Sequence, residues 1–172
     1  MKLVVAVDKD WGIGYKGGLL ASVRADLAHF KELTMGKTVI LGSKTLATFP
    51  GGKPLKGRTN VILSRRADFS PEGAVVAHSF EELLTYVQTH PEEDFLVIGG
   101  SSVYNLLLPY CDTAYVTVFD KRFARKDAYF TNLDTDRHWR CVSVGERQYS
   151  TKETDSEDGI PFYFTEYRRV KF

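Results

Sequence analysis

The sequence predicts an α/β fold: a mainly parallel, twisted central sheet with helices on both faces and an antiparallel hairpin at its C-terminal edge. Short runs rich in Val and Ile alternate with helical patterns over the first two-thirds of the chain, which is typical of parallel strands joined by helices. The last two long apolar runs have only the polar loop Ser150–Pro161 between them, so we expect them to pair antiparallel. No interior segment resembles a linker, and residues 1–172 are expected to form one domain.

The strands are predicted from apolar, β-branched runs that are bounded by turn residues. In chain order they are Lys2–Val7, Lys37–Leu41, Asn60–Leu63, Ala74–Ala77, Phe95–Ile98, Thr113–Phe119, Arg140–Tyr149 and Phe162–Arg169.

Four helices are predicted from apolar residues at helical spacing and from capping residues. They are Ala25–Leu33, Ser43–Thr48, a helix opened by Ser79-Phe80-Glu81-Glu82, and one that runs from Gly99-Gly100-Ser101 through Leu108. Ser43 is expected to be the N-cap of the second helix. Ser79 followed by Glu82 is the pattern of a capping box at the start of the third.

Composition excludes several classes of protein. Apolar residues make up 43% of the 172 residues, and 23 basic residues balance 22 acidic ones, which argues against a general nucleic-acid binder. Cys111 and Cys141 make neither a disulfide framework nor a zinc site, and the four histidines lack metal-ligand spacing. No apolar run is long enough for a membrane span or a signal peptide. We therefore expect a cytoplasmic protein without a metal.

Asp26 stands among apolar residues near the start of the first predicted helix. One interpretation is a first-turn carboxylate that complements the helix dipole. The other is a carboxyl that faces an apolar pocket, where desolvation raises its pKa. Such a group suits the binding of a protonated heterocycle or acid catalysis.

Three turns that follow predicted strands carry residues suited to phosphate: Gly99-Gly100-Ser101-Ser102, Gly42-Ser43-Lys44-Thr45 and Ser64-Arg65-Arg66. Glycines let a backbone approach a ligand, helix N-termini attract phosphate, and the basic side chains add charge. A phosphorylated dinucleotide is the ligand that they favour, although neither GxGxxG nor a P-loop is present. The alternatives are tight turns without a ligand and a solvated basic turn.

Taken in order, these residues and several others resemble dihydrofolate reductase from end to end. The matching features are an opening strand followed by Ile13-Gly14, Asp26 with Phe30 four residues later, Gly42 with Thr45, the stretch Pro54-Leu55-Lys56-Gly57-Arg58, Val97–Gly100 with Tyr104 in the next helix, and Thr117 in the strand after it. Each feature is weak alone, but their common order and spacing make the resemblance specific.

The resemblance implies roles for residues at the substrate. Asp26, helped by Thr117, is expected to bind N3 and the 2-amino group of a pteridine. Arg58 is expected to pair with the α-carboxylate of the substrate's glutamate. The other residues expected at the substrate are Val5, Leu27, Phe30, Ile98 and Tyr104.

The resemblance also implies NADPH as the cofactor. Ser64 and Arg65 match the family's contacts to a 2′-phosphate, which favours NADPH over NADH. Ala6 and Ile13 are expected to edge the nicotinamide. The full set expected at the cofactor is Ala6, Ile13, Gly14, Gly42, Ser43, Lys44, Thr45, Leu63, Ser64, Arg65, Gly99, Gly100, Ser101, Ser102 and Val103.

The implied reaction is reduction of 7,8-dihydrofolate to 5,6,7,8-tetrahydrofolate, by hydride transfer from NADPH to C6 with protonation at N5. Two alternatives stay open: a related reductase of riboflavin-type synthesis, and a non-catalytic NADPH-binding module. The expected partners are dihydrofolate and NADPH, in a monomer that binds neither nucleic acid nor membranes.

Ala21 stands where many family members have Trp, so an open pocket is expected there. Asp127 matches an acid that ties a neighbouring loop to the mobile loop Trp11–Leu20.

Overall fold

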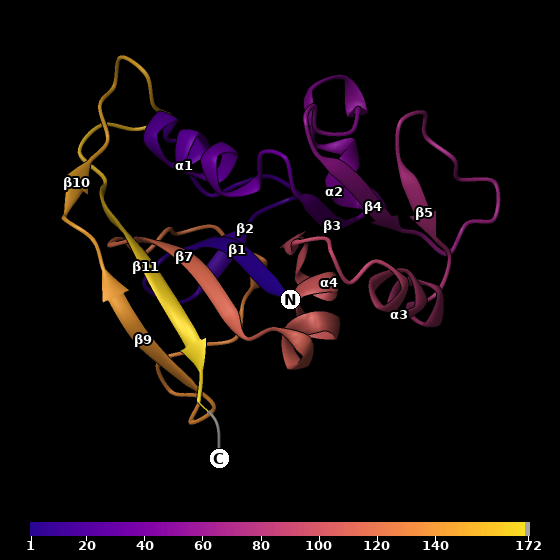
Figure 1. Ribbon diagram of the computed structural model, residues 1–172. Coiled ribbons are helices and arrows are strands. Elements are labelled where there is room, and N and C mark those ends of the chain that lie inside the picture. The colour runs from indigo at the N-terminus through magenta and orange to yellow at the C-terminus, as the bar shows by residue number, and fades with distance from the viewer. Residues whose placement is uncertain (171–172) are drawn as a thin grey trace.

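The computed structural model describes residues 1–170, in which nine strands form one sheet (Figure 1). Their order is β10-β11-β7-β1-β6-β3-β4-β5, and β9 also pairs with β11. The bounds are β1 (Lys2–Val7), β3 (Thr38–Gly42), β4 (Thr59–Leu63), β5 (Val75–Ala77), β6 (Phe95–Gly99), β7 (Thr113–Phe119), β9 (Trp139–Val144), β10 (Gln148–Tyr149) and β11 (Pro161–Arg169). Strands β1 and β3–β7 are joined by parallel pairings, whereas β11 pairs antiparallel with β7, β9 and β10. The predicted fold class is confirmed.

Helices cover both faces of the sheet. In the described chain they are α1 (Arg24–Thr34), α2 (Ser43–Ala47), α3 (Phe80–Thr89) and α4 (Ser101–Leu107), with 3-10 turns η1 (Pro50–Gly52) and η2 (Leu108–Tyr110). Leu83 of α3 and Leu107 of α4 are buried in the largest apolar cluster, on one face. Leu46 of α2 is buried against the other face, on which α1 also lies. None of the described helices is long and apolar enough to cross a membrane.

The predicted strand Arg140–Tyr149 is wrong as a single element, because it divides into β9 and β10. The break lies at Gly145, whose N–H donates to the Phe164 carbonyl at 2.7 Å. A Cβ at position 145 would lie 3.1 Å from that oxygen, so the small residue lets the chain bend. Both short strands still pair with β11, which confirms the antiparallel edge.

Of the two N-cap residues predicted from the sequence, the structure confirms one. Ser79 accepts the Glu82 N–H at 3.1 Å, which confirms it as the N-cap of α3. The Glu82 carboxylate accepts the N–H of His78 at 2.7 Å, one residue before the position that a capping box predicts. Ser43 is not a cap, because α2 begins at Ser43 itself and Gly42 occupies the N-cap position.

A two-stranded ribbon that was not predicted joins β2 (Gly12–Gly14) to β8 (Ala128–Tyr129). The buried carboxylate of Asp8, just after β1, holds this region together. It accepts the N–H groups of Gly12 at 2.9 Å and Phe123 at 3.1 Å, and the Lys126 ammonium at 2.5 Å. Asp8 therefore ties the start of β2, beside Ile13, to the segment that carries Phe123 and Lys126.

Candidate active site

Asp26 lies in the first turn of α1, and its carboxylate contacts the sheet through Thr117 of β7. The Thr117 hydroxyl donates to Asp26 Oδ1 at 2.6 Å, and the threonine is buried. Burial raises the pKa of Asp26, while the hydrogen bond from Thr117 and the charge of His29 act in the opposite direction. The structure thus contains the desolvated carboxyl that the sequence offered as one of two interpretations.

Strand register decides which side chains share a face of the sheet with Asp26. Ala6 pairs with Thr117, and Thr117 pairs in turn with Phe164. Side chains alternate along each strand, so residues two positions apart lie on the same face. The Asp26 face, as we name it, consists of Val4, Ala6, Ile98, Thr117 and Phe164.

Val5 is not brought to the Asp26 face. Its side chain packs in the main core with Trp11, on the opposite face. Val4, which was not predicted, presents its carbonyl to the Tyr104 hydroxyl at 2.5 Å. Burial, and then the charge of Asp26, hold the pKa of the Tyr104 phenol far above its usual range. Side chains two positions apart on a strand share a face, so counting back from Ala6 places Val4 on the Asp26 face.

Helix α1 presents a different chemical group at each end. Asp26 stands in its first turn, and the side chain of Leu27 beside it is 47% exposed. At the other end Arg58 donates from Nη1 to the Thr34 hydroxyl at 3.1 Å and from Nε to the Lys56 carbonyl at 2.9 Å. No carboxylate within residues 1–170 forms an ion pair with Arg58. Its charge is therefore held in place and available to a ligand.

Phe30 is half-buried, one helical turn after Asp26. It therefore lies between the acid at the start of α1 and Thr34 at its end. The helix thus combines an acid, an apolar middle and a cation held at its far end.

The carboxyl ends of β6, β3 and β4 meet at one edge of the sheet. The register pairs Gly42 with Leu63, and β3 also pairs with β6. The following turns approach closely: a Cβ on Gly42 would lie 3.2 Å from Val103, and one on Gly100 would lie 3.4 Å from the Thr45 hydroxyl. Open α/β sheets bind ligands at such strand ends. We name residues 42–45, 63–65 and 99–103 the strand-end cluster.

This cluster contains two exposed cations. Lys44 and Arg65 enter no ion pair with any residue that the structure describes. Ser64, by contrast, is buried, and its hydroxyl accepts the Arg66 N–H at 3.3 Å, so it shapes the turn. His78 lies beside this turn, and its Nδ1 is 3.1 Å from the Ser64 carbonyl. The parallel pairing of β4 with β5 brings His78, which follows β5, next to Ser64, which follows β4.

Ser101 and Ser102 begin α4 directly after Gly100, which is the N-cap residue of that helix. Ser101 is half-buried and Ser102 is exposed. The predicted strand-to-helix turn is therefore present, with both hydroxyl residues at its helical end.

The loop after β2 is tied to Asp127. The Asp127 carboxylate accepts the Lys16 N–H at 3.0 Å, and the Asp127 N–H donates to the Gly14 carbonyl at 2.9 Å. These contacts agree with the tie that the resemblance implied. Ile13 is half-buried and packs against the main core.

Ala21 comes directly after the loop Trp11–Leu20, and apolar side chains surround it. It is 6% exposed and belongs to a cluster with Phe119 and Phe162. Trp11 does not occupy the space of a missing indole, because it packs on Phe130 and Tyr167 on the opposite face of the sheet.

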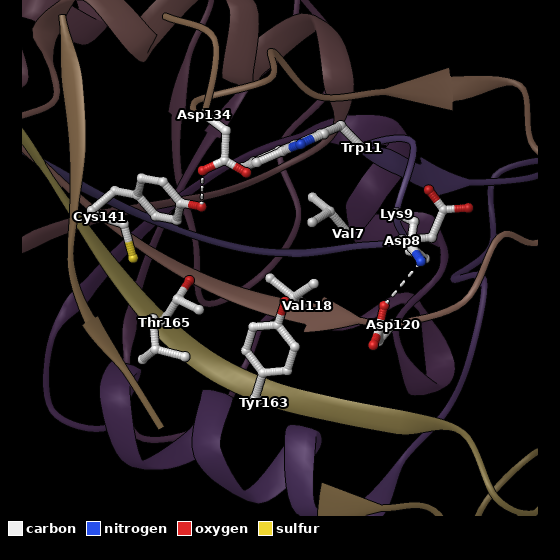
Figure 2. Close-up of a pocket in the computed structure, with 12 residues that line it drawn as sticks. Val7, Asp8, Lys9, Trp11, Val118, Asp120, Asp134, Cys141, Tyr163 and Thr165 are labelled. Carbon is white, nitrogen blue, oxygen red and sulfur yellow. Dashed lines mark hydrogen bonds and ion pairs between the residues drawn. The ribbon is translucent and has the colours of Figure 1, made fainter. Parts of the chain in front are cut away.

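Two cavities in the described structure lie outside this site. One of about 370 Å³ opens on the opposite face (Figure 2). Several of its polar groups already have partners: Tyr167 donates to Asp134 at 2.6 Å, and Lys9 pairs with Asp120 at 3.4 Å. None of the predicted site residues lines it. The second, of about 380 Å³, lies between the start of α1 and the loop after β10.

Comparisons with known proteins agree with one another. A family model described as dihydrofolate reductase matches residues 1–169. The dihydrofolate reductase of Mycobacterium tuberculosis (strain H37Rv) is 40% identical over 139 residues, covering 80% of this chain and 82% of that protein. That of Neisseria meningitidis serogroup A is 32% identical, covering 97% and 96%. A solved structure of dihydrofolate reductase from Enterococcus faecalis, complexed with NADP(H) and RAB-propyl, has a TM-score of 0.83 at 32% identity, covering 99% and 96%.

The raised pKa of Asp26 predicts that its ionised form destabilises the folded protein at neutral pH. Asp26→Asn keeps an oxygen that can accept the Thr117 hydroxyl but removes the charge, so the free energy of unfolding should rise. Because the folded pKa lies above the ordinary aspartate value, the gain should shrink as pH falls through the folded pKa and vanish below the unfolded one. Urea denaturation from about pH 3 to about pH 8 measures this. A variant less stable than the parent at neutral pH would contradict it.

Proposed function

The chain belongs to the dihydrofolate reductase family, and we propose that its Asp26 face holds the substrate and its strand-end cluster the cofactor. It reduces 7,8-dihydrofolate to 5,6,7,8-tetrahydrofolate with NADPH. When bound, NADPH supplies the hydride that reaches C6 of the pteridine. The riboflavin-type alternative is not favoured, because the relatives described above are dihydrofolate reductases.

The observation that carries the proposal is the half-buried, desolvated carboxyl of Asp26 held by Thr117. A pteridine presents N3–H and a 2-amino group side by side, and one carboxylate can accept both. The Thr117 hydroxyl fixes the rotation of the carboxyl toward that edge. We assign the final proton delivery to water, because N5 lies on the second ring, away from the N3 edge.

The rest of the substrate site follows α1 and the sheet. Leu27 and Phe30 supply apolar contact for the aminobenzoyl group, and Ile98 contributes from the sheet. Arg58, oriented by Thr34 at 3.1 Å, is assigned the glutamate α-carboxylate, a planar bidentate ligand that suits a guanidinium.

On β1 we propose Val4 rather than Val5 as the residue at the substrate. Val4 shares the Asp26 face, whereas the Val5 side chain belongs to the core. The carbonyl of Val4 is held by Tyr104.

The residues of the strand-end cluster fit a phosphorylated dinucleotide. Lys44 and Arg65 are exposed cations, and the turns at Gly42 and Gly100 have little room for side chains. We assign Arg65 to the 2′-phosphate and give Ser64 the supporting role of shaping its turn. Ala6 and Ile13 are proposed to lie at the edge of the nicotinamide ring.

Further properties are proposed on fewer observations. One continuous sheet joins β10 to β5, which supports a single domain over residues 1–172. We propose a monomer, because the proposed substrate and cofactor sites need no residue from a second copy. The balance of 23 basic and 22 acidic residues argues against nucleic acid as a partner. Cys111 and Cys141 are free thiols, which supports a reducing compartment such as the cytoplasm.

Asp26→Asn should lower the rate of NADPH oxidation with dihydrofolate by about 100-fold at neutral pH, because the neutral amide cannot match both donors of the pteridine edge. The Kd for NADPH should change by less than about twofold. Stopped-flow absorbance and fluorescence titration measure the two quantities. Glu32→Gln, an exposed acid of the same helix, is the control. Activity within about twofold of the parent would remove Asp26 from the mechanism.

Arg65→Ala should raise the KM for NADPH by about tenfold and leave that for NADH nearly unchanged, because only NADPH offers a 2′-phosphate. The matched control is Arg66→Ala, since the neighbouring guanidinium lies over the Phe69 ring at 5.2 Å. Steady-state kinetics with both cofactors decide the assignment. An equal loss with NADPH and NADH would place Arg65 elsewhere.

Arg58→Ala should raise the KM for dihydrofolate by about tenfold through loss of a charge-assisted pair. A reduced pterin without the glutamyl tail should be affected far less. Lys56→Ala, which removes a nearby exposed cation, is the control. The same loss with both substrates would show that Arg58 does not bind the tail.

A further inference from the structure

Helix α1, which carries Asp26, begins without a side-chain cap of its own. Its N-cap residue is Val23, which has extended backbone angles and makes no capping hydrogen bond. Valine is a poor N-cap, because it has no side-chain oxygen for the unpaired N–H groups of the first turn. Val23 is buried instead with Phe119 and Phe162, so apolar packing occupies the position of a cap.

The missing acceptor comes from the loop between β10 and β11. Asp155 Oδ1 accepts the Arg24 N–H at 2.8 Å, across 131 positions of sequence. Its other oxygen accepts the Thr151 N–H at 2.7 Å, and the Thr154 hydroxyl donates to Oδ1 at 3.0 Å. The backbone donors, Arg24 first, hold the pKa of Asp155 below its ordinary value. The cap is therefore a carboxylate at neutral pH.

A second contact fixes the chain just before the helix. The Ser22 N–H donates to Ser156 Oγ at 2.9 Å, and the Ser156 N–H donates to the Ser22 carbonyl at 2.8 Å. The loop is braced internally by Ser150, whose hydroxyl donates to the Glu157 carbonyl at 2.6 Å and accepts the Ile160 N–H at 2.7 Å. Figure 1 shows this loop beside the start of α1.

Apolar packing holds the loop to the helix only at Val23, which is buried in one cluster with Ile160 at the end of the loop. Beyond Val23, a cavity of about 380 Å³ separates the two, with Ala25 and Ala28 on the helix side and Tyr149 and Thr151 on the other. The hydrogen bonds to Ser22 and Arg24 therefore act together with this packing to set the position of the first turn of α1 relative to the loop.

We propose that Asp155 is a positioning residue for Asp26: it caps α1 from the β10–β11 loop and so holds the Asp26 carboxyl against Thr117. Asp26 lies two residues beyond Arg24, within the turn that the cap orders. The proposal rests on the proposed function of Asp26, but the cap can be measured without catalysis. The titratable groups that act on Asp26 or feel its charge are His29 of α1 and Tyr104 of α4.

The test compares Asp155→Ala with Asp158→Ala. Asp158 belongs to the same loop but accepts the Lys152 N–H, a contact within the loop. In Asp155→Ala we expect hydrogen exchange of the Arg24 amide to accelerate about tenfold and kcat to fall about fivefold. The pH profile of hydride transfer should move to lower pH, because a looser first turn hydrates Asp26 and lowers its raised pKa. Asp158→Ala should leave all three unchanged.

Asp155→Asn provides a second variant of nearly the same shape. Its amide oxygen can accept the Arg24 N–H, but its NH2 group cannot also accept from Thr151, so the effects should be intermediate. A pH profile equal to that of Asp158→Ala in both Asp155 variants would overturn the proposal, whatever the Arg24 exchange rate. An active Asp26→Asn enzyme would overturn the proposed function instead, which separates the two failures.

Discussion

The hydrogen bond of 2.6 Å from Thr117 to Asp26 joins the sheet to helix α1, and the rest of the site is arranged around it. It requires β7 to lie beside β1, which makes Ala6 the neighbour of Thr117, and it requires α1 to begin over the same face. Burial raises the pKa of Asp26 while the hydrogen bond opposes that rise. The carboxyl is therefore desolvated without being left unpaired, which is the condition under which a buried polar group is tolerated.

The two halves of the site differ in the interactions that they offer to a ligand. On the Asp26 face, where we propose the substrate, one desolvated acid and one held cation stand at opposite ends of α1, with apolar side chains between them. In the strand-end cluster, where we propose the cofactor, the close approach of backbones at Gly42 and Gly100 combines with exposed cations at Lys44 and Arg65. Charge is thus concentrated locally in a chain whose net charge is only +1.

Sequence patterns predicted the features that depend on local periodicity and spacing. The parallel strands β1 and β3–β7, the helix that carries Asp26 and the turns after β3, β4 and β6 belong to this group. Features that depend on register or on distant loops could not be predicted. Val4 was missed in favour of Val5 because the pairing of Ala6 with Thr117 decides which face each side chain takes. Asp155 could not be singled out within the polar loop Ser150–Pro161, because its contact with the Arg24 N–H spans 131 positions of sequence.

The claim that a desolvated carboxyl held by Thr117 organises the site is tested most directly by measuring the pKa of Asp26 itself. Carbon-13 NMR titration of the labelled carboxyl, in the parent and in Thr117→Val, gives that value without reference to turnover. We expect a pKa above the ordinary aspartate value of 3.8 in the parent, because burial is the largest cause of the shift. We expect a higher value still in Thr117→Val, because the hydrogen bond that stabilises the ionised form is lost. A parent pKa at or below 3.8, unchanged by Thr117→Val, would contradict the claim.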